Sequence, residues 1–595
     1  MVYFCTQIDQ FLRTMLSFNH LKKNLKKDFS SFKKIKIAIL SDSASQFLVN
    51  ALRGYGYETG LDMDIYEADY NQIDLQVFDP SSELYSFAPE YIYIDRSTQK
   101  LLKEHYKHHT QEQVAYADEI VSKTQKYCDT IAARLKAKII LNTYPEINDS
   151  VFGNYAAKTP SSFLFQQRKL NLGLMELAQK EKNVFICDLA AVASQVGQKT
   201  VFDPKMYVNA DMVYSLDFLP LIAKHVTDII LSISGSFKKC LILDLDNTTW
   251  GGIIGDDGME GIQVGYFGAG KIYTELQLWA KQLKKRGIIL CICSKNTEEI
   301  AREPFEKHPD MVLRMDDIAV FVANWETKVD NIRHIKNILN IGFDSMVFLD
   351  DNPFEREIVR TAIPEVTVPE LPEDPAEYQS YLRQLNLFET ASFTEEDEQR
   401  TRQYQEEAQR NVLLASFENE ADFLASLNMT SVVKEFDTFS IPRVSQLTQR
   451  SNQFNLRTIR YTEEDIRNIS KDDSFMGVSL TLEDRFGDHG LIALIILKKQ
   501  DTTTLFIDTW IMSCRVLKRG MENFTLNTIV DFAAANGFTK VIGEYLPTKK
   551  NAIVKDHYAM LGFEQADGLW QLDVANYKKR DTFVTAKNEI WTPTT

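Results

Sequence analysis

The chain has 595 residues, of which 44% are hydrophobic and 25% charged, as in ordinary folded proteins, and this length predicts about three or four domains. Its formal net charge of −16 at pH 7 argues against nonspecific binding to nucleic acid or membranes. The seven cysteines are scattered, and we find neither a signal peptide nor an apolar run long enough to span a bilayer, so we expect reduced thiols and a cytoplasmic location.

Residues 1–34 place apolar side chains at helical spacing and predict an N-terminal helical segment. Residues 35–235 predict an α/β domain, because short apolar runs that suit buried strands alternate with helix-forming stretches. The turn after the first strand runs from Ser41 through Asp42 to Ser43. It places Ser43 where SGNH hydrolases carry their nucleophile, and the domain resembles that doubly wound fold.

Two departures separate this domain from an active SGNH hydrolase. Ser41 stands where the family has glycine. No Asp-x-x-His pair late in the domain supplies a base, since Asp217 is followed three residues on by Pro220 and His225 is out of place. A serine without its histidine is a poor nucleophile. We therefore expect a hydrolase-like domain used for positioning or partner binding, with an active esterase as the alternative.

Residues 236–388 carry polar residues at the ends of successive apolar runs. Runs 240–243, 287–293 and 345–349 suit buried parallel strands, whose carboxyl ends face the crevice where α/β folds bind ligands. The polar residues that follow these runs, with a lysine between the second and third, are Asp244, Asp246, Thr248, Ser294, Lys328, Asp350 and Asp351. Two carboxylates ~4 Å apart repel by about 4 kcal/mol at an effective dielectric of ~20. Such a pair needs a cation, and hard oxygen ligands suit Mg²⁺.

This order of acid pair, hydroxyl, lysine and acid pair resembles the haloacid-dehalogenase (HAD) superfamily of phosphotransferases. The resemblance implies that Asp244 attacks phosphorus in line and forms an aspartyl-phosphate. It implies that Asp246 protonates the leaving oxygen and offers its main-chain carbonyl to Mg²⁺. Lys328 would offset the crowded negative charge.

The same resemblance gives Thr248 and Ser294 hydrogen bonds to the phosphoryl oxygens. Asp351, with Asp350 beside it, would complete the metal site, and either could be the direct ligand. Only 50 positions separate Asp244 from Ser294, and 34 separate Ser294 from Lys328. These gaps leave no room for the large cap domain that many superfamily members carry, so we expect an uncapped site that admits a macromolecule.

Residues 389–430 contain neither Gly nor Pro and predict an exposed helical linker. Residues 431–595 then predict antiparallel strands, a helix and a further strand, followed by Asn551, Tyr558 and the sequence Leu-Gly-Phe at 561–563. This layout resembles the α+β fold of the GNAT acyltransferases.

The pyrophosphate loop of that family is only partly matched. Arg515 and Gly520 keep its first and last positions, but Lys518 replaces the first glycine. The resemblance implies binding of acyl-CoA or phosphopantetheine here, with ordinary acetyl transfer disfavoured. Tyr558 matches the general acid of the family, with a core tyrosine as the alternative.

The three domains in this order resemble the FkbH-like proteins, and the match covers nearly the whole chain after residue 35. The sequences that carry it include LDLDNTTWGGIIGDDG, FLDDNPFERE, QRSNQFNLRTIRYTEEDI and DTWIMSCRVLKRG. One departure is Thr249, where the family commonly has leucine, and we expect it to alter packing only. The family implies a phosphatase that takes 1,3-bisphosphoglycerate and loads a glyceryl unit onto the phosphopantetheine thiol of an acyl carrier protein, for polyketide or related natural-product biosynthesis.

Two cysteines are candidates to carry the acyl group. Cys293 directly precedes Ser294, and Cys514 lies before the partly matched loop; the alternative for either is an inert thiol. His489 is a candidate base or carrier contact, or a structural histidine. Two other functions stay open: a simple Mg²⁺-dependent phosphatase on a carrier-docking scaffold, and an acyltransferase acting on a glycan or amino sugar.

Overall fold

The computed structural model describes residues 16–587 except 28, 30, 394–401, 407–409, 411–416, 418, 452, 514, 515, 518, 549, 550 and 567. Residues 394–401, 407–409, 411–416 and 418 of the predicted linker lie outside the described residues, and α20 (Glu420–Ser426) at its end is helical. Half of the N-terminal segment 1–34 is described, and in it α2 (Phe18–Asn24) is helical as predicted. The chain divides into two compact units, residues 1–232 and 233–595.

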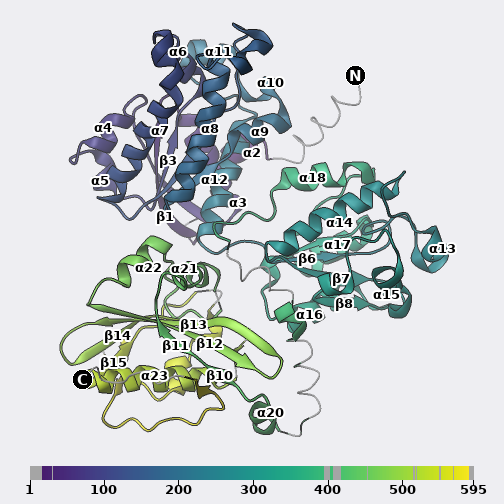
Figure 1. Cartoon of the computed structure of the whole chain (residues 1–595), viewed down its shortest axis with the longest axis vertical. Helices are drawn as coiled ribbons and strands as arrows, with labels where there is room; N and C mark the ends of the chain where they lie inside the picture. Colours follow the sequence, from purple (N-terminus) through teal and green to yellow (C-terminus); the bar gives the residue numbers. More distant parts are fainter. Residues whose placement is uncertain are drawn as a thin grey trace. The chain divides into compact units, whose positions relative to one another are not determined.

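The first unit is built on a five-stranded parallel sheet in the order β2-β1-β3-β4-β5 (Figure 1). The strands are β1 (Lys33–Ser41), β2 (Leu61–Glu67), β3 (Tyr91–Asp95), β4 (Lys138–Asn142) and β5 (Val184–Cys187). The helices between and after them include α3 (Gln46–Glu58), α6 (Thr98–His105), α7 (Thr110–Ala132), α8 (Phe163–Lys180), α9 (Leu189–Val196), α11 (Pro204–Ala210) and α12 (Leu219–Ile233). This topology agrees with the predicted doubly wound domain.

Both faces of the inner part of this sheet are buried, which explains why β3 and β4 are buried almost throughout, whereas the edge strand β2 alternates and exposes Asp64. One face packs against α7 and α8, and its strand residues include Ala38, Ile92 and Ile139. The side chains that point the other way from β1 and β3, such as Ile37 and Tyr93, are also fully buried. In β3 and β4, the polar side chains therefore lie at the strand ends.

The second unit begins with a four-stranded parallel sheet in the order β8-β7-β6-β9. Its strands are β6 (Cys240–Leu243), β7 (Ile289–Ser294), β8 (Val320–Ala323) and β9 (Met346–Leu349). Its helices are α13 (Ile254–Gly261), α14 (Gly270–Lys285), α15 (Glu298–Lys307), α16 (Lys328–Leu339), α17 (Pro353–Ala362) and α18 (Tyr378–Leu385). Residues 244–351 are all described and contain only the strands β7, β8 and β9, the helices α13 to α16, short 3₁₀ turns and loops, with no separate cap domain, as the spacing predicts.

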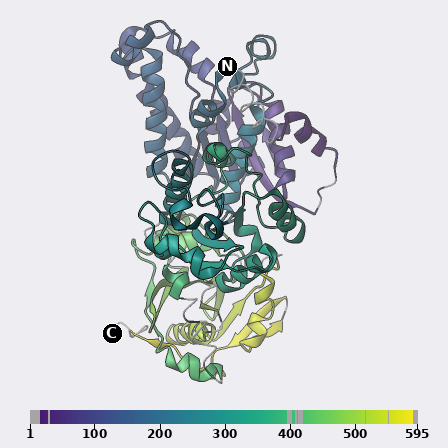
Figure 2. The same ribbon diagram turned by 90° about the vertical axis from the view of Figure 1, so that its right-hand side faces the viewer.

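The rest of this unit is a nine-stranded mixed sheet. Its strands are β10 (Thr430–Ser431), β11 (Val433–Glu435), β12 (Phe475–Asp484), β13 (Gly487–Lys499), β14 (Thr504–Met512), β15 (Lys540–Gly543), β16 (Glu564–Ala566), β17 (Leu569–Asp573) and β18 (Thr585–Ala586). Antiparallel β12, β13 and β14 lead through α23 (Met521–Ala535) to β15, which pairs in parallel with β14. Figures 1 and 2 show α23 along one face of the sheet. This is the predicted α+β layout, and the overall fold class is confirmed.

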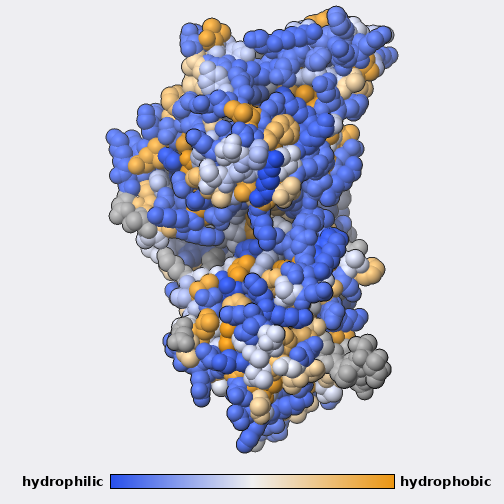
Figure 3. Space-filling view, turned by 90° about the vertical axis from the view of Figure 1, so that its left-hand side faces the viewer, coloured by the Kyte–Doolittle hydropathy of each residue, from blue (hydrophilic) through white to orange (hydrophobic). Residues whose placement is uncertain are grey.

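The described residues contain no helix that is both long enough and apolar enough to cross a membrane. On the face shown in Figure 3, hydrophobic residues occur in small groups among hydrophilic ones. Single exposed apolar side chains are normal on a folded protein, so these small groups need no separate explanation.

Candidate active site

Three carboxylates meet at the carboxyl ends of two neighbouring strands of the four-stranded sheet. Asp244 follows β6, and Asp350 and Asp351 follow β9. Because Leu243 pairs with Leu349, the two strands end side by side. One oxygen from each of the three carboxylates lies within 4.8 Å of the others, and this is the only such group of potential metal ligands among the described residues.

Lys328 joins this group as the first residue of α16. Its ammonium group is buried and donates to Asp244 Oδ1 at 2.5 Å and to the Cys293 carbonyl at 2.8 Å. It also lies 3.2 Å from Asp350 Oδ2. Burial opposes the charged form of Lys328, but the carboxylates of Asp244 and Asp350 outweigh this effect and raise its pKa. The lysine therefore stays charged at any physiological pH.

One lysine does not balance three carboxylates. Burial, reinforced by Asp244, raises the pKa of Asp350 to about 7, and the same causes raise the pKa of Asp351. Asp350 Oδ2 is buried, and apart from the ion pair with Lys328 at 3.2 Å it has no hydrogen-bond partner among the described residues. A divalent cation would supply the missing positive charge, and three hard oxygen donors fit Mg²⁺. Asp244, Asp350 and Asp351 would hold it, so both candidates at 350 and 351 lie in the group.

The Asp246 carboxylate is not part of this group but is held in a separate orientation. Its Oδ1 accepts from the Trp250 indole at 2.9 Å and from the Ile254 main chain at 3.1 Å. Its Oδ2 accepts from Asn296 Nδ2 at 2.9 Å. Three N–H donors fix the side chain that we expect to transfer a proton. The predicted metal contact of Asp246 concerned its main-chain carbonyl, so this placement leaves that contact untested.

Three positioning residues here were not predicted. Asn296 and Trp250 orient Asp246, and Arg356 Nη1 donates to the main-chain oxygens of Asp350 (2.9 Å) and Asp351 (2.6 Å). All three lie within a few residues of the motifs that carry the resemblance, and this closeness in the sequence is the feature that could have indicated them. Their contacts depend on how the loops fold back, which the spacing does not show.

The structure places Thr248 and Ser294 differently from each other. Thr248 is fully buried, and its Oγ1 accepts from the Asp351 main chain at 3.0 Å, so it ties two loops together; its bond to a phosphoryl oxygen stays a prediction. Ser294 ends β7 and accepts from Asn296 Nδ2 at 3.2 Å, close to Asp246. Thr249 Oγ1 donates to the Asp244 main-chain oxygen at 2.5 Å, a bond that leucine could not make.

Cys293 is poorly placed to carry an acyl group. Its side chain is fully buried in the core behind the sheet, among residues such as Ile332 and Phe348. Burial, only partly countered by Lys328, raises the pKa of its thiol to about 12. A reactive thiol needs exposure and a lowered pKa, so the structure favours the inert alternative for Cys293. Cys514 lies outside the described residues.

The predicted nucleophile of the first unit lies in a closed crevice. Ser43 is 2% exposed, and its hydroxyl is 3.4 Å from that of Ser41, which contacts Asp95. His225 lies on α12, and burial lowers the pKa of its imidazole to about 4, beside Lys224. No histidine is recorded in contact with Ser43 among the described residues, so the arrangement favours the positioning role over the esterase.

In the C-terminal sheet, the chain itself occupies the gap where β14 and β15 diverge. Met512 N donates to the Phe454 carbonyl at 3.2 Å, and Leu546 N donates to the Leu456 carbonyl at 2.9 Å. An extended pantetheine arm or peptide bound in this gap would have to pair with these same main-chain groups. Asn551 holds the segment, because its Nδ2 donates to the carbonyls of Asn455 (2.9 Å) and Leu546 (3.0 Å).

The other predicted pantetheine contacts that the structure describes are Tyr558, His489 and Gly520. The Tyr558 hydroxyl is buried, which raises its pKa, but it has no hydrogen-bond partner in the part of the chain that is described, whereas the core alternative expects a satisfied hydroxyl. His489 is 1% exposed, and its Nε2 lies 3.0 Å from both Arg410 Nη2 and Asp484 Oδ2. Gly520 adopts φ +80° before α23, where its carbonyl accepts from the Thr582 hydroxyl. Arg515, like Cys514, lies outside the described residues.

Comparison with known proteins adds three findings. Residues 36–231 match the family model of the FkbH N-terminal domain. The N-terminal part of protein BF1531 from Bacteroides fragilis, which contains a phosphatase domain complexed with Mg, is 52% identical; the match covers 63% of this chain and 100% of that one, with a TM-score of 0.62. The ribosomal-protein-S18-alanine N-acetyltransferase of Escherichia coli is 15% identical over 24% of this chain and 94% of its own, with a TM-score of 0.20. No curated protein matches the chain.

Proposed function

The chain belongs to the FkbH family, and from that premise we propose that it is a Mg²⁺-dependent phosphatase of the HAD type that loads a three-carbon acyl unit onto an acyl carrier protein. The observation that carries the proposal is the group of Asp244, Asp350 and Asp351 around Lys328. The Mg of the Bacteroides phosphatase domain, which is 52% identical, supports the choice of cation.

The proposed phosphatase step uses two aspartates in sequence. An Asp244 oxygen attacks the phosphorus of the 3-phosphate of 1,3-bisphosphoglycerate, and the bond between this phosphorus and the oxygen on carbon 3 breaks. Asp246, held by Trp250 and Asn296, gives its proton to that leaving oxygen and then takes one from the water that hydrolyses the aspartyl-phosphate. Bound Mg²⁺ would neutralise charge on the phosphoryl oxygens, and Lys328 shares this role.

In the proposed acyl transfer, the carrier's phosphopantetheine thiolate attacks the acyl-phosphate carbonyl. A thioester bond forms, the acyl C–O bond breaks, and inorganic phosphate leaves. The burial of Cys293 supports transfer directly to the carrier thiol, without an intermediate on that cysteine. Whether Asp244 acts before or after this step does not change the atoms exchanged.

The mouth of the site supports a macromolecular partner. It has no cap, and exposed apolar side chains follow three of the strands: Phe267 (92% exposed) before α14, Trp325 (75%) in the loop after β8 and Phe354 (67%) in the first turn of α17. Exposed aromatic residues beside a catalytic opening are typical of protein-binding sites. We assign this rim to contact with the carrier.

The decisive experiment is intact-mass analysis of holo acyl carrier protein incubated with the protein, 1,3-bisphosphoglycerate and Mg²⁺. The proposal predicts the mass gain of one glyceryl unit, lost with Asp244→Asn and reduced with Trp325→Ala, while Trp279→Ala, at a partly buried position away from the rim, keeps it. Phosphate release with no mass gain would leave a phosphatase on a docking scaffold. The absence of both the loaded carrier and released phosphate would reject the proposal.

A further inference from the structure

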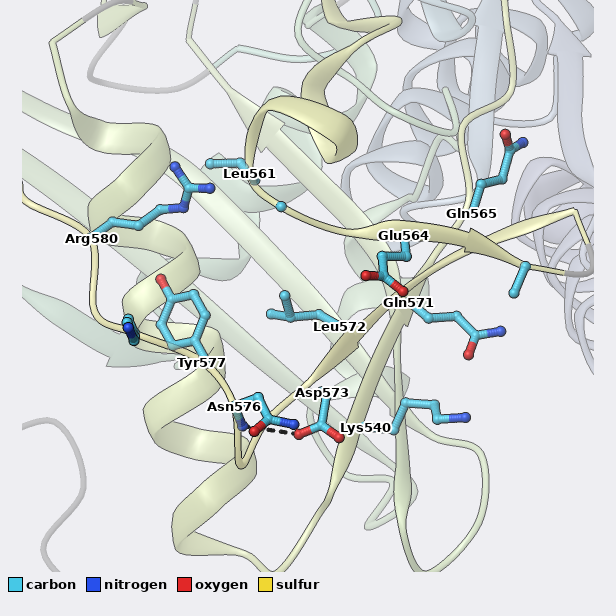
Figure 4. Close-up of a pocket in the computed structure, with 13 residues that line it drawn as sticks. Lys540, Leu561, Glu564, Gln565, Gln571, Leu572, Asp573, Asn576, Tyr577 and Arg580 are labelled. Carbon is cyan, nitrogen blue, oxygen red and sulfur yellow. Dashed lines mark hydrogen bonds between the residues drawn. The ribbon is translucent and has the colours of Figure 1, made fainter.

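A cavity of about 710 Å³ lies beside β16 and β17, at one end of the nine-stranded sheet (Figure 4). Its wall also includes the first residue of β15 and the segment 576–580. It contains none of the residues predicted to bind pantetheine and none of the phosphatase residues. Its size is within the usual range for small-molecule sites, about 300–1,000 Å³.

Arg580 is held rigidly at one side of this cavity. Its main-chain N donates to Asn527 Oδ1 at 3.0 Å, and its carbonyl accepts from Asn527 Nδ2 at 2.9 Å. The Tyr577 hydroxyl also donates to Asn527 Oδ1, at 2.6 Å. One side chain of α23 thus fixes the whole segment, so that the arginine is presented to the cavity by an ordered backbone.

The Arg580 guanidinium has room and free donors. It lies beside Gly562, which has φ +86°, and a Cβ at that position would be 3.2 Å from Arg580 Nη2. Among the described residues, the structure records no ion pair for this guanidinium. The neighbouring Lys579 differs, because its Nζ lies 2.8 Å from Asp531. Lys540 and Lys578 add two further positive charges to the cavity wall.

The opposite side of the cavity carries groups that suit hydroxyls. Figure 4 shows Gln565 and Gln571 across the cavity from Arg580, with Glu564 and Leu572 between them. Glu564 and Gln571 are paired residues on adjacent strands, so their side chains leave the same face of the sheet. Carboxylate and amide oxygens accept from hydroxyl groups, and amide nitrogens donate to them. The acid Asp573 is partly used, since its Oδ1 accepts from the Asn576 main chain at 3.0 Å.

From this arrangement we propose that the C-terminal domain binds a phosphorylated polyhydroxy metabolite, with the phosphate at Arg580 and the hydroxyls at Glu564 and Gln571. The planar fork of arginine matches phosphate geometry, and Lys540 and Lys578 add long-range attraction. The apolar floor of Leu561 and Leu572 would contact the carbon skeleton. This site is independent of the proposed phosphatase and acyl transfer.

The test uses ribose 5-phosphate as the probe, titrated into the full chain by calorimetry in EDTA, so that the metal-dependent site is not loaded. We expect saturable binding at one site per chain. Arg580→Gln should weaken it about tenfold or more, because a charged hydrogen-bond pair is lost. Lys579→Gln removes the same charge from the adjacent residue, whose ammonium is paired with Asp531, and should leave affinity unchanged. Arg580→Lys keeps the positive charge but not the planar guanidinium donors, so its affinity should lie between those of Arg580→Gln and Lys579→Gln.

Two further measurements separate the two halves of the site. Glu564→Gln should weaken ribose 5-phosphate and leave inorganic phosphate unaffected. Unphosphorylated ribose should bind much more weakly than its phosphate. The proposal is overturned if ribose 5-phosphate shows no saturable binding up to about 10 mM, if Arg580→Gln binds as wild type with an unchanged circular dichroism spectrum, or if ribose binds as tightly as ribose 5-phosphate.

Discussion

Two crevices in this chain have the same topological position but differ in whether a cation is bonded to their carboxylates. Each lies at the carboxyl ends of parallel strands and holds aspartates: Asp42 and Asp95 in the first unit, and the group around Asp244 in the second. In the first unit, both Asp42 oxygens accept from the Ser97 main chain, and Asp95 accepts from Ser41 and Tyr214 hydroxyls. No ammonium or guanidinium is hydrogen-bonded to these two carboxyls in the described structure.

The physical difference is how each crevice deals with its charge. Burial raises the pKa of Asp42 to about 7 and that of Asp95 to about 6, so these carboxyls are stabilised by holding protons. The group at Asp244 instead keeps a charged lysine, which is the only polar partner within the described structure of one of its buried oxygens, Asp350 Oδ2. Carboxylates at a strand end therefore indicate a catalytic site only when the surrounding residues supply cations and leave an opening.

The largest expected effect separates the two crevices by activity. Asp244→Asn removes the nucleophile and should lower phosphate release by about 10⁴-fold or more. Ser43→Ala should leave the rate within about twofold, since Ser43 is closed off and has no base. Phosphate release from a phosphorylated three-carbon acid measures both. A large loss with Ser43→Ala would show that the first crevice is catalytic and would reverse the comparison.

The next effect concerns metal binding. Mg²⁺ at a hundred times its dissociation constant should stabilise the fold by about 2.7 kcal/mol, seen as a higher thermal midpoint. Asp350→Asn should remove most of this shift because it removes one of three close carboxylates. Asp42→Asn should keep it, because Asp42 belongs to no group of potential metal ligands in the described structure. An equal loss in both variants would mean that the metal is not bound where proposed.

The sequence predicts that Asp244, Asp350 and Asp351 meet, because parallel strands that are neighbours in a sheet end together. Leu243 and Leu349 are paired, and the residues that follow them must meet. The sequence does not predict on which face of the sheet Cys293 lies. Because β7 is buried on both faces, its residues do not alternate between apolar and polar, and nothing in the pattern tells one face from the other. It also does not predict that residues 454–456 fill the gap beside β14, because that pairing joins segments more than fifty residues apart.

The third effect is on stability as a function of pH, and it concerns the first crevice alone. Unfolded aspartates lose their protons near pH 4, whereas folded Asp42 keeps its proton up to about pH 7. Between these values the folded state binds more protons than the unfolded state, so the unfolding free energy of this unit should fall as pH rises, by at most about 1.4 kcal/mol per pH unit for each such group. Above pH 7 the contribution of Asp42 should be constant.

Hydrogen exchange of the β1 and β3 amides, corrected for intrinsic rates, measures this slope. Asp42→Asn should flatten it between pH 4 and 7, while Asp64→Asn, at an exposed position on β2, should not. An unfolding free energy that rises with pH in the wild-type protein would show that the first crevice holds ionised carboxylates. The two crevices would then be more alike than we conclude.

The smallest effect tests how the second crevice holds its acid. Trp250→Phe removes one of three hydrogen bonds to Asp246 and leaves those from Ile254 and Asn296. The remaining donors should keep the carboxylate near its place, so we expect a loss of kcat of up to about tenfold, equivalent to one hydrogen bond of about 1.4 kcal/mol. Trp279→Phe is the matched control, since its indole packs against Phe388 and makes no recorded contact with Asp246. An unchanged kcat in Trp250→Phe would mean that Trp250 only fills space and that the Ile254 main chain and Asn296 orient the proton donor.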